Sequence, residues 1–377
     1  MIIIYRDENI CPEYLKFKNL YKGLKKACSG VRWKTSVTQF ETNALKNISS
    51  IQDDVMNGKY QLREYTEMTI KEPKERHITA TNIRDRVLQR SLCDETITGI
   101  LSKSFIKENC ACQKNKGTEY ALNLLKEQIH SEYIRNGNTD QLFYLKCDVH
   151  HFFESINHDV LKQILYKKFY PNYESEYRRC IEIIDSFGEV GLGLGSQVSQ
   201  LLALTYLDSL DHFIKEQLHI KCYIRYMDDF ILVSRSKDIL KDCLVRIKEF
   251  LSNIHLELNG KTQIGKLCNG VSFLNWKFVL KPTGKVVMIV NPQKLAKKRK
   301  KLKRMIANED ITDEQIIEAA RGMIAHLSIG NAYKAIQEIK SLLNSVNIKI
   351  PEKKLTKIQE LEMWVDNFCY YNPELQE

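Results

Sequence analysis

Two adjacent carboxylates, Asp228 and Asp229, lie between two apolar runs, residues 222–224 before them and residues 230–233 after them. Asp is a poor strand former, so the pair is expected at the turn of a β-hairpin, where it is exposed or neutralised by a cation. A solvated turn with no chemical role is the alternative interpretation for this stretch alone.

A third carboxylate, Asp148, ends another apolar segment, residues 142–147, which is typical of a buried strand. Aspartates at the ends of core strands are natural metal ligands. Two divalent ions bridged by them can activate a 3′-hydroxyl and stabilise a leaving pyrophosphate in an in-line displacement. Oxygen-only ligands favour Mg²⁺ over zinc. The spacing therefore predicts a magnesium site, provided that the two strands are neighbours.

The wider order of motifs resembles the bacterial reverse transcriptases of the group II intron-like lineage. The match spans most of the chain, and an ordered set of blocks is far more specific than one Asp-Asp pair. The blocks that carry the resemblance are residues 71–89, 109–122, 146–161, 191–200, 223–233, 256–264 and 273–278.

This resemblance implies an α+β right-hand polymerase with fingers, an antiparallel palm sheet backed by helices, and a helical thumb. The expected fingers are residues 1–140, with 161–187 returning to them, the palm is 141–290 and the thumb 291–377. A chain of 377 residues with 43% hydrophobic residues is long enough for two or three such domains. Helices are predicted over residues 83–101, 199–218, 239–254, 313–330, 332–344 and 354–367.

The charge pattern favours a polyanionic partner. The net charge is +10, and residues 294–304 carry eight Lys or Arg in eleven positions. Net charge alone would also suit a ribosome-like or membrane-surface partner, and the basic run alone could be a solvated helix face. With the other motifs it predicts a stripe that follows nucleic-acid phosphates, formed by Lys297, Lys298, Arg299, Lys300, Lys301 and Arg304.

The eleven cysteines are mostly scattered singly, and we expect them to be reduced core residues. Cys110 and Cys112 form the one close pair, with no second pair at ligand spacing to complete a zinc site. The amino terminus has no basic-then-apolar secretion pattern, and no apolar run approaches the roughly 18 residues that span a bilayer. We therefore expect a cytoplasmic protein with no membrane partner.

The resemblance assigns roles around the predicted metal site. Asp148, Asp228 and Asp229 are the expected catalytic carboxylates. Asp148, Asp228 and the Val149 carbonyl are expected to hold Mg²⁺, for which Mn²⁺ can substitute. Phe153 matches the aromatic steric gate that leaves no room for a 2′-hydroxyl. The alternative for Phe153 is a core position, because one of the consecutive aromatics Phe152 and Phe153 must point inward.

Further positions are expected to bind the nucleotide or the primer. Arg76, with Lys71 and Lys74, corresponds to the basic segment that grips the triphosphate, since Arg suits bidentate phosphate contacts. The remaining expected nucleotide contacts are Leu194, Gly195, Gln200 and Lys261. The primer grip is expected at Phe273, Leu274, Asn275 and Trp276, where Asn275 replaces the Gly of most relatives.

Residues 194–200 read branched-aliphatic-Gly-x-x-x-Ser-Gln, the form found in reverse transcriptases of diversity-generating retroelements. Leu194 stands where other relatives carry an amide, so discrimination that depends on hydrogen bonds should fall, and we expect reduced fidelity. The leading hypothesis is an error-prone enzyme that uses template RNA, a DNA or RNA primer, dNTPs and a small basic accessory protein. An antiphage defence enzyme and a non-catalytic RNA-binding or splicing cofactor are the alternatives.

Overall fold

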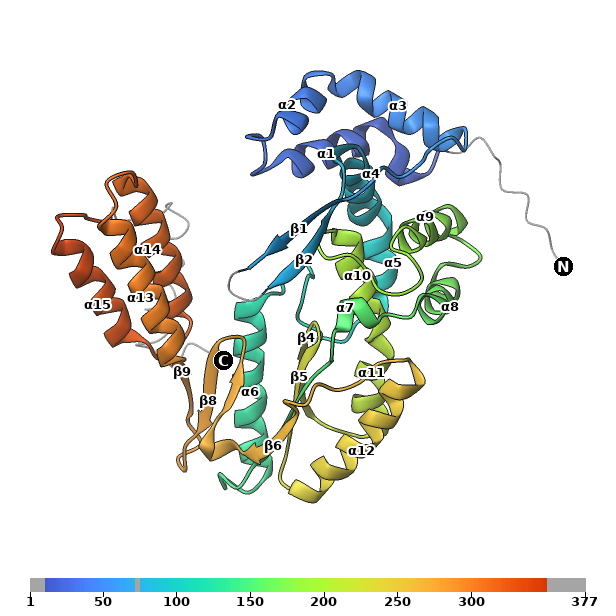
Figure 1. The fold of residues 1–377 in the computed structure, drawn as a ribbon. Helices are drawn as coiled ribbons and strands as arrows, with labels where there is room; N and C mark the ends of the chain where they lie inside the picture. Colours follow the sequence, from blue (N-terminus) through green and yellow to red (C-terminus); the bar gives the residue numbers. More distant parts are fainter. Residues whose placement is uncertain (1–10, 72–74, 351–377) are drawn as a thin grey trace, which may run out of the picture. The chain divides into compact units, whose positions relative to one another are not determined.

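The computed structural model describes residues 11–71 and 75–350. The chain divides into two compact units, with the boundary between Val287 and Met288. Figure 1 shows a helical amino-terminal region, a central sheet with its helices, and the helices α13, α14 and α15 in the second unit. In the described ranges, no helix combines the length and apolar character needed to cross a bilayer.

The first helices of unit 1 pack on one another through a close approach at Gly23. A Cβ at this position would lie 2.9 Å from the Val87 carbonyl oxygen, so glycine lets α1 contact α4 closely. The elements of this region are a 3-10 turn at Glu13–Leu15, α1 (Phe17–Cys28), α2 (Thr35–Thr42), α3 (Ala44–Met56), α4 (Ile83–Leu92), α5 (Thr98–Leu101) and the antiparallel hairpin of β1 (Thr66–Ile70) and β2 (Arg76–Ala80).

The helix predicted over residues 83–101 is confirmed, with one local change. The segment Cys93–Ile97 between α4 and α5 is π-helical, a widening that a sequence period of 3.6 cannot reveal. A 3-10 turn, Ser102–Ser104, follows α5.

The central sheet has four strands in the order β4-β5-β3-β6, and its neighbours pair antiparallel. Both middle strands are apolar and buried, while α6 packs against β4 and α12 against β3 and β5. The elements are α6 (Thr118–Arg135), β3 (Phe143–Asp148), β4 (Cys222–Tyr226), β5 (Asp229–Ser234), α12 (Lys237–Asn253) and β6 (Gln263–Lys266).

The helices between β3 and β4 are α7 (Phe152–Ser155), α8 (His158–Phe169), α9 (Glu174–Asp185), α10 (Gln197–Tyr206) and α11 (Asp208–His212), followed by a π-helical turn at Phe213–Gln217. The long helix expected over residues 199–218 is therefore interrupted near Leu207. After β6 come a 3-10 turn, Leu267–Asn269, and a sheet in the order β7-β8-β9, with β7 Val271–Phe273, β8 Trp276–Leu280 and β9 Val286–Val290.

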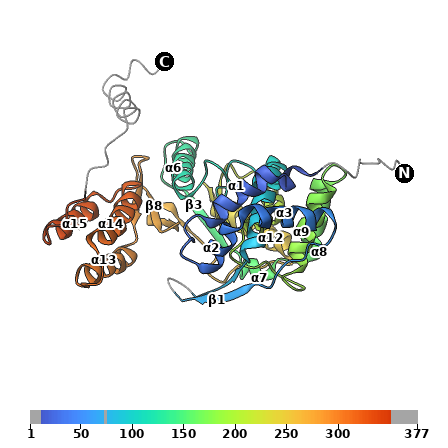
Figure 2. The same cartoon turned by 90° about the horizontal axis from the view of Figure 1, so that it is seen from above.

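Three helices form the described part of unit 2, α13 (Pro292–Ile306), α14 (Asp313–Ser328) and α15 (Tyr333–Asn344), and they lie side by side in Figures 1 and 2. Asn291 caps α13 by accepting from the backbone of Gln293 and Lys294, and Pro292 supplies the fixed φ of a first helical residue. The helix expected over residues 354–367 lies outside the described residues.

The fold class is confirmed as α+β, with helices and separate antiparallel sheets. The ten described cysteines are free, and seven of them are buried.

Candidate active site

The antiparallel register of β3 and β5 places Asp148 directly opposite Asp229, at the same end of both strands. Side chains at opposed positions lie on the same face of a sheet. Asp228 belongs to the turn between β4 and β5, and its carbonyl accepts a hydrogen bond from the Val149 backbone N–H at 3.3 Å. Two segments that are eighty residues apart in the chain are thus joined by a backbone hydrogen bond next to the carboxylates.

Lys146 forms an ion pair with this cluster. It lies two residues before Asp148 on β3, and its Nζ is 3.1 Å from Oδ2 of Asp229. The same amino group donates to the Ser272 carbonyl at 2.8 Å, which links the carboxylates to β7. No sequence motif identified Lys146. Its position two residues before Asp148 on a strand nevertheless implies that both side chains lie on the same face of the sheet.

The carboxyl group of Asp229 has a perturbed pKa. Burial raises this pKa to about 6, Lys146 opposes the shift, and the negative charges of Asp148 and Asp228 add to it. Among the described residues, Asp229 Oδ1 is buried with no hydrogen-bond partner. Protein groups alone leave this buried oxygen without a hydrogen bond and next to the negative charges of two further carboxylates. A bound cation would satisfy the oxygen and offset that charge.

The protein side chains at this site could supply only part of the coordination shell of a divalent cation. The described residues contain no group of three or more His, Cys, Asp or Glu side chains gathered so as to hold a metal ion by themselves. Mg²⁺ is usually bound in polymerase-type sites by one or two carboxylates, with waters and substrate phosphates completing the octahedron. Asp148, Asp228 and the Val149 carbonyl would supply only part of the coordination of such an ion.

Asn259 holds the predicted ligand Asp148 in place. Its Nδ2 donates to Oδ2 of Asp148 at 3.2 Å, and its backbone N–H donates to the Asp148 carbonyl at 2.7 Å. The Oδ1 of Asn259 also accepts from the backbone N–H of Lys261 at 3.1 Å, while the Lys261 side chain is exposed. The sequence motif predicted a role for Lys261 but not for Asn259. The one feature that could have identified Asn259 is its position two residues before Lys261 in the same motif.

The two consecutive aromatics of α7 have different surroundings. Phe152 is 3% exposed and belongs to the core, whereas Phe153 is half-buried at its edge. The Phe153 carbonyl accepts from the Leu192 backbone N–H at 2.7 Å, so α7 is fixed to the segment that leads to Leu194. Phe153 is thus the more exposed of the two aromatic residues.

The segment that carries Leu194 and Gly195 lies against the hairpin of β1 and β2. The backbone N–H of Thr79 donates to the Leu194 carbonyl at 2.7 Å. Gly195 has φ +128°, and a Cβ there would lie 3.0 Å from the Thr79 carbonyl oxygen, so glycine allows both the conformation and the approach. On α10, Gln200 Oε1 accepts from the Cys112 thiol at 3.4 Å.

The basic residues expected to grip the triphosphate are exposed at the other end of this hairpin. Ile70 pairs with Arg76 at the last register position, and Lys71 follows β1. Lys74 lies outside the described residues.

The predicted primer-grip residues form the tight turn between β7 and β8. Phe273 and Trp276 pair across the strands and are each 1% exposed. Leu274 and Asn275 both have positive φ, 46° and 75°, as a two-residue hairpin turn of type I′ requires. Asn tolerates this region better than other non-glycine residues, which explains how Asn275 can occupy this turn position.

In unit 2, most of the basic residues of α13 are exposed, whereas Arg299 forms an ion pair with another helix. Leu295 and Leu302 are buried, while Lys297, Lys300, Lys301 and Arg304 recur at i, i+3, i+4 and i+7 on the exposed face. Lys298 is also exposed.

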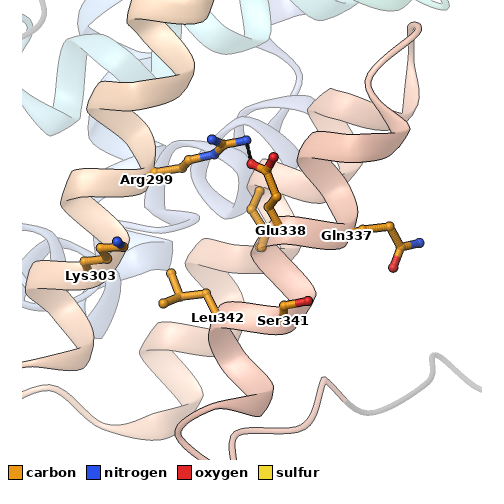
Figure 3. Close-up of a pocket in the computed structure, with 7 residues that line it drawn as sticks. Arg299, Lys303, Gln337, Glu338, Ser341 and Leu342 are labelled. Carbon is orange, nitrogen blue, oxygen red and sulfur yellow. Dashed lines mark ion pairs between the residues drawn. The ribbon is translucent and has the colours of Figure 1, made fainter.

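Arg299 is directed differently. It forms an ion pair with Glu338 of α15, beside a cavity of about 470 Å³ that Arg299, Lys303 and Leu342 help to line, as Figure 3 shows. This pairing sets Arg299 apart from the outward-facing stripe.

Comparisons with known proteins agree with this geometry. Residues 69–278, more than half of the chain, match the family described as "Reverse transcriptase (RNA-dependent DNA polymerase)". A structure of apo telomerase from Candida tropicalis is similar, with a TM-score of 0.51 and 13% identity over 76% of this chain and 59% of that chain. A telomerase from Candida albicans in complex with a fragment of telomeric RNA gives a TM-score of 0.49 and 12% identity over 82% and 59%.

The chain spans 59% of the length of these two telomerase chains, and no curated protein matches its sequence. The likeness to the Candida tropicalis structure, at 13% identity, shows the fold alone, whereas the family match covers the strands and turns that carry Asp148, Asp228 and Asp229. The chain belongs to the reverse transcriptase family, whose members are RNA-directed DNA polymerases.

Proposed function

We propose that this protein copies RNA into DNA by extending a DNA or RNA primer with dNTPs at Asp148, Asp228 and Asp229. The observation that carries the proposal is the pairing of Asp148 with Asp229 across β3 and β5, next to the turn that holds Asp228. Divalent cations bound there, Mg²⁺ or Mn²⁺, would favour ionisation of the primer 3′-hydroxyl and neutralise charge on the leaving pyrophosphate.

The protein's own side chains would align the reactants. Asn259 orients Asp148, and Lys146 partly neutralises Asp229, so the carboxylates keep one arrangement before the nucleotide arrives. Arg76, Lys71 and Lys261 would bind the triphosphate. The Phe153 ring would lie under the sugar and exclude a 2′-hydroxyl, while the turn at Leu274 and Asn275 would support the primer end.

We also propose the domain roles that the resemblance implies: fingers at 1–140 with 161–187, palm at 141–290 and thumb at 291–377. Two contacts support the return of 161–187 to the fingers. Tyr14 Oη and Ser175 Oγ are 2.8 Å apart, and the Arg179 guanidinium lies 5.8 Å from the Tyr60 ring centroid.

Primer extension tests the activity. Wild-type protein with Mg²⁺ should extend a DNA primer on a defined RNA template, and Asp148→Asn should lose extension by at least about a thousandfold. Asp238→Ala is the matched control, because Asp238 is an exposed aspartate at the start of α12. If the wild type makes no cDNA but binds RNA tightly, the protein is a non-catalytic RNA-binding cofactor and the proposal is wrong.

Within this activity, we propose the mutagenic role of a diversity-generating retroelement enzyme, acting with a small basic accessory protein. The support is Leu194, whose side chain offers no hydrogen-bond donor at a position next to Gly195 and the β2 backbone. Leu194→Gln should lower misincorporation at template adenines, and Leu194→Met, which keeps an apolar side chain, should not. Equal error rates in the wild type and Leu194→Gln, measured by sequencing the cDNA, would argue against this role.

A further inference from the structure

The strand that leads into the catalytic turn contains a fully buried ion pair. Arg225 of β4 and Asp211 of α11 are each 0% exposed, and the Arg225 side chain donates from Nε to Asp211 Oδ1 at 2.6 Å and from Nη2 to Oδ2 at 2.5 Å. Tyr223, also 0% exposed, donates its hydroxyl to the same Oδ1 at 2.6 Å. These hydrogen bonds join α11, which carries Asp211, to β4, which carries Arg225 and Tyr223; both elements are labelled in Figure 1.

Stability alone does not explain this pair. Removing two charges from water costs about as much as their mutual attraction returns, so an apolar pair of similar volume is often equally stable. The third donor of Arg225 points to another role. Its Nη1 donates to the Met227 carbonyl at 2.9 Å, inside the turn that precedes Asp228.

Met227 needs such support because its φ is +59°. A residue with a Cβ is disfavoured in this left-handed conformation, because its Cβ lies too close to a backbone carbonyl oxygen. The β4 backbone is itself anchored, since the Arg225 N–H donates to the Glu108 carbonyl and its carbonyl accepts from the Cys110 N–H, both at 3.0 Å. Arg225 therefore connects a rigid strand and a buried carboxylate to the strained turn.

We propose that Arg225 is a positioning residue that, oriented by Asp211, holds the Met227 turn so that Asp228 is directed at the metal-binding position. A guanidinium can form the bidentate contact with Asp211 and reach the Met227 carbonyl at the same time, whereas a lysine ammonium on its single stem cannot. The inference rests on the proposed polymerase function, and it adds a residue that acts on catalysis without touching the substrate.

The test compares Arg225→Lys with Tyr223→Phe in the full chain. Arg225→Lys keeps a cation beside Asp211 and removes the hydrogen bond to Met227, so kcat for single-nucleotide incorporation should fall by at least about tenfold. The Mg²⁺ concentration for half-maximal rate should rise, and Mn²⁺ binding to the complex with primer–template and dNTP, followed by electron paramagnetic resonance, should weaken. Affinity for primer–template should stay within about twofold.

Tyr223→Phe is the matched control, because it removes one bond to Asp211 and leaves the hydrogen bond between Arg225 and Met227 in place. It should lower the melting temperature while Mn²⁺ affinity stays at the wild-type value. Should Arg225→Lys fail to fold, the double variant Asp211→Asn with Arg225→Met removes both charges and should show the same loss of Mn²⁺ affinity.

Two results would overturn the inference: wild-type kcat and Mn²⁺ affinity in the folded Arg225 variant, or an equal loss in Tyr223→Phe. An inactive wild-type enzyme would instead refute the proposed function, so the two failures are distinguishable.

Discussion

Asp148 and Asp229 occupy opposed positions in the ladder between β3 and β5, and each is held by a different neighbour. Asn259 donates to Asp148, whereas Lys146 forms an ion pair with Asp229 at 3.1 Å. The two carboxylates are thus held by separate protein groups, and in the proposed active site this arrangement would preorganise them for a cation.

Lys146 should matter for both activity and stability. Lys146→Met leaves Asp229 without its cation, so kcat should fall by about tenfold or more and the free energy of unfolding by about 1–3 kcal/mol. Lys146→Arg should recover part of both, because it keeps the charge. Primer extension and urea denaturation measure the two effects, with Lys241→Met as an exposed control. Unchanged kcat in Lys146→Met would show that Asp229 needs no neighbouring cation.

Phe153 should control the choice of sugar. Phe153→Val replaces the ring that would lie under the sugar with a smaller side chain and makes room for a 2′-hydroxyl. The kcat/KM ratio of dNTP to rNTP should therefore fall by about tenfold or more, and each tenfold corresponds to about 1.4 kcal/mol. Phe152→Leu is the control, because Phe152 is 3% exposed and its loss should cost stability without changing the ratio. A ratio that responds to Phe152 and not to Phe153 would reverse the assignment.

The exposed stripe of α13 should set the salt dependence of nucleic-acid binding. Replacing Lys297, Lys300, Lys301 and Arg304 together by Ala should weaken primer–template binding, and the slope of log affinity against log salt should drop by about 0.7–0.9 for each phosphate that the variant no longer neutralises. Fluorescence anisotropy across a salt series measures this. Arg299→Ala should change the slope less, because Arg299 pairs with Glu338. An unaltered slope in the fourfold variant would identify the stripe as a solvated face.

The turn at Asn275 should tolerate Gly and resist β-branched residues. With φ at +75°, Asn275→Gly keeps the conformation, whereas Asn275→Val should destabilise the protein by about 1–2 kcal/mol. Denaturant unfolding of both variants checks the prediction. Equal stability of the Val and Gly variants would mean that the turn relaxes to another conformation.

Much of the polymerase core was predictable from local patterns. The apolar runs around Asp228 and before Asp148 predict the strands β3, β4 and β5, because strand formation there follows from short buried segments that end in polar residues. These features depend on neighbours in the sequence.

The contacts of the residues that were not predicted depend on which strands pair and in which register. Asn259 meets Asp148 across 111 positions, and Lys146 meets Ser272 across 126. Arg225 is a charged residue inside an apolar strand, and only the placement of α11 explains why it is buried. No local pattern encodes which residues face one another across such separations.

The proposed polymerase activity depends most on the convergence of Asp148 and Asp228 around one metal-binding position. Anomalous diffraction from crystals of the complex with primer–template, a non-hydrolysable dNTP analogue and Mn²⁺ tests it directly. We predict a manganese peak within about 2–2.6 Å of carboxylate oxygens from both Asp148 and Asp228. A manganese peak elsewhere, with these two carboxylates sharing no ion, would contradict it.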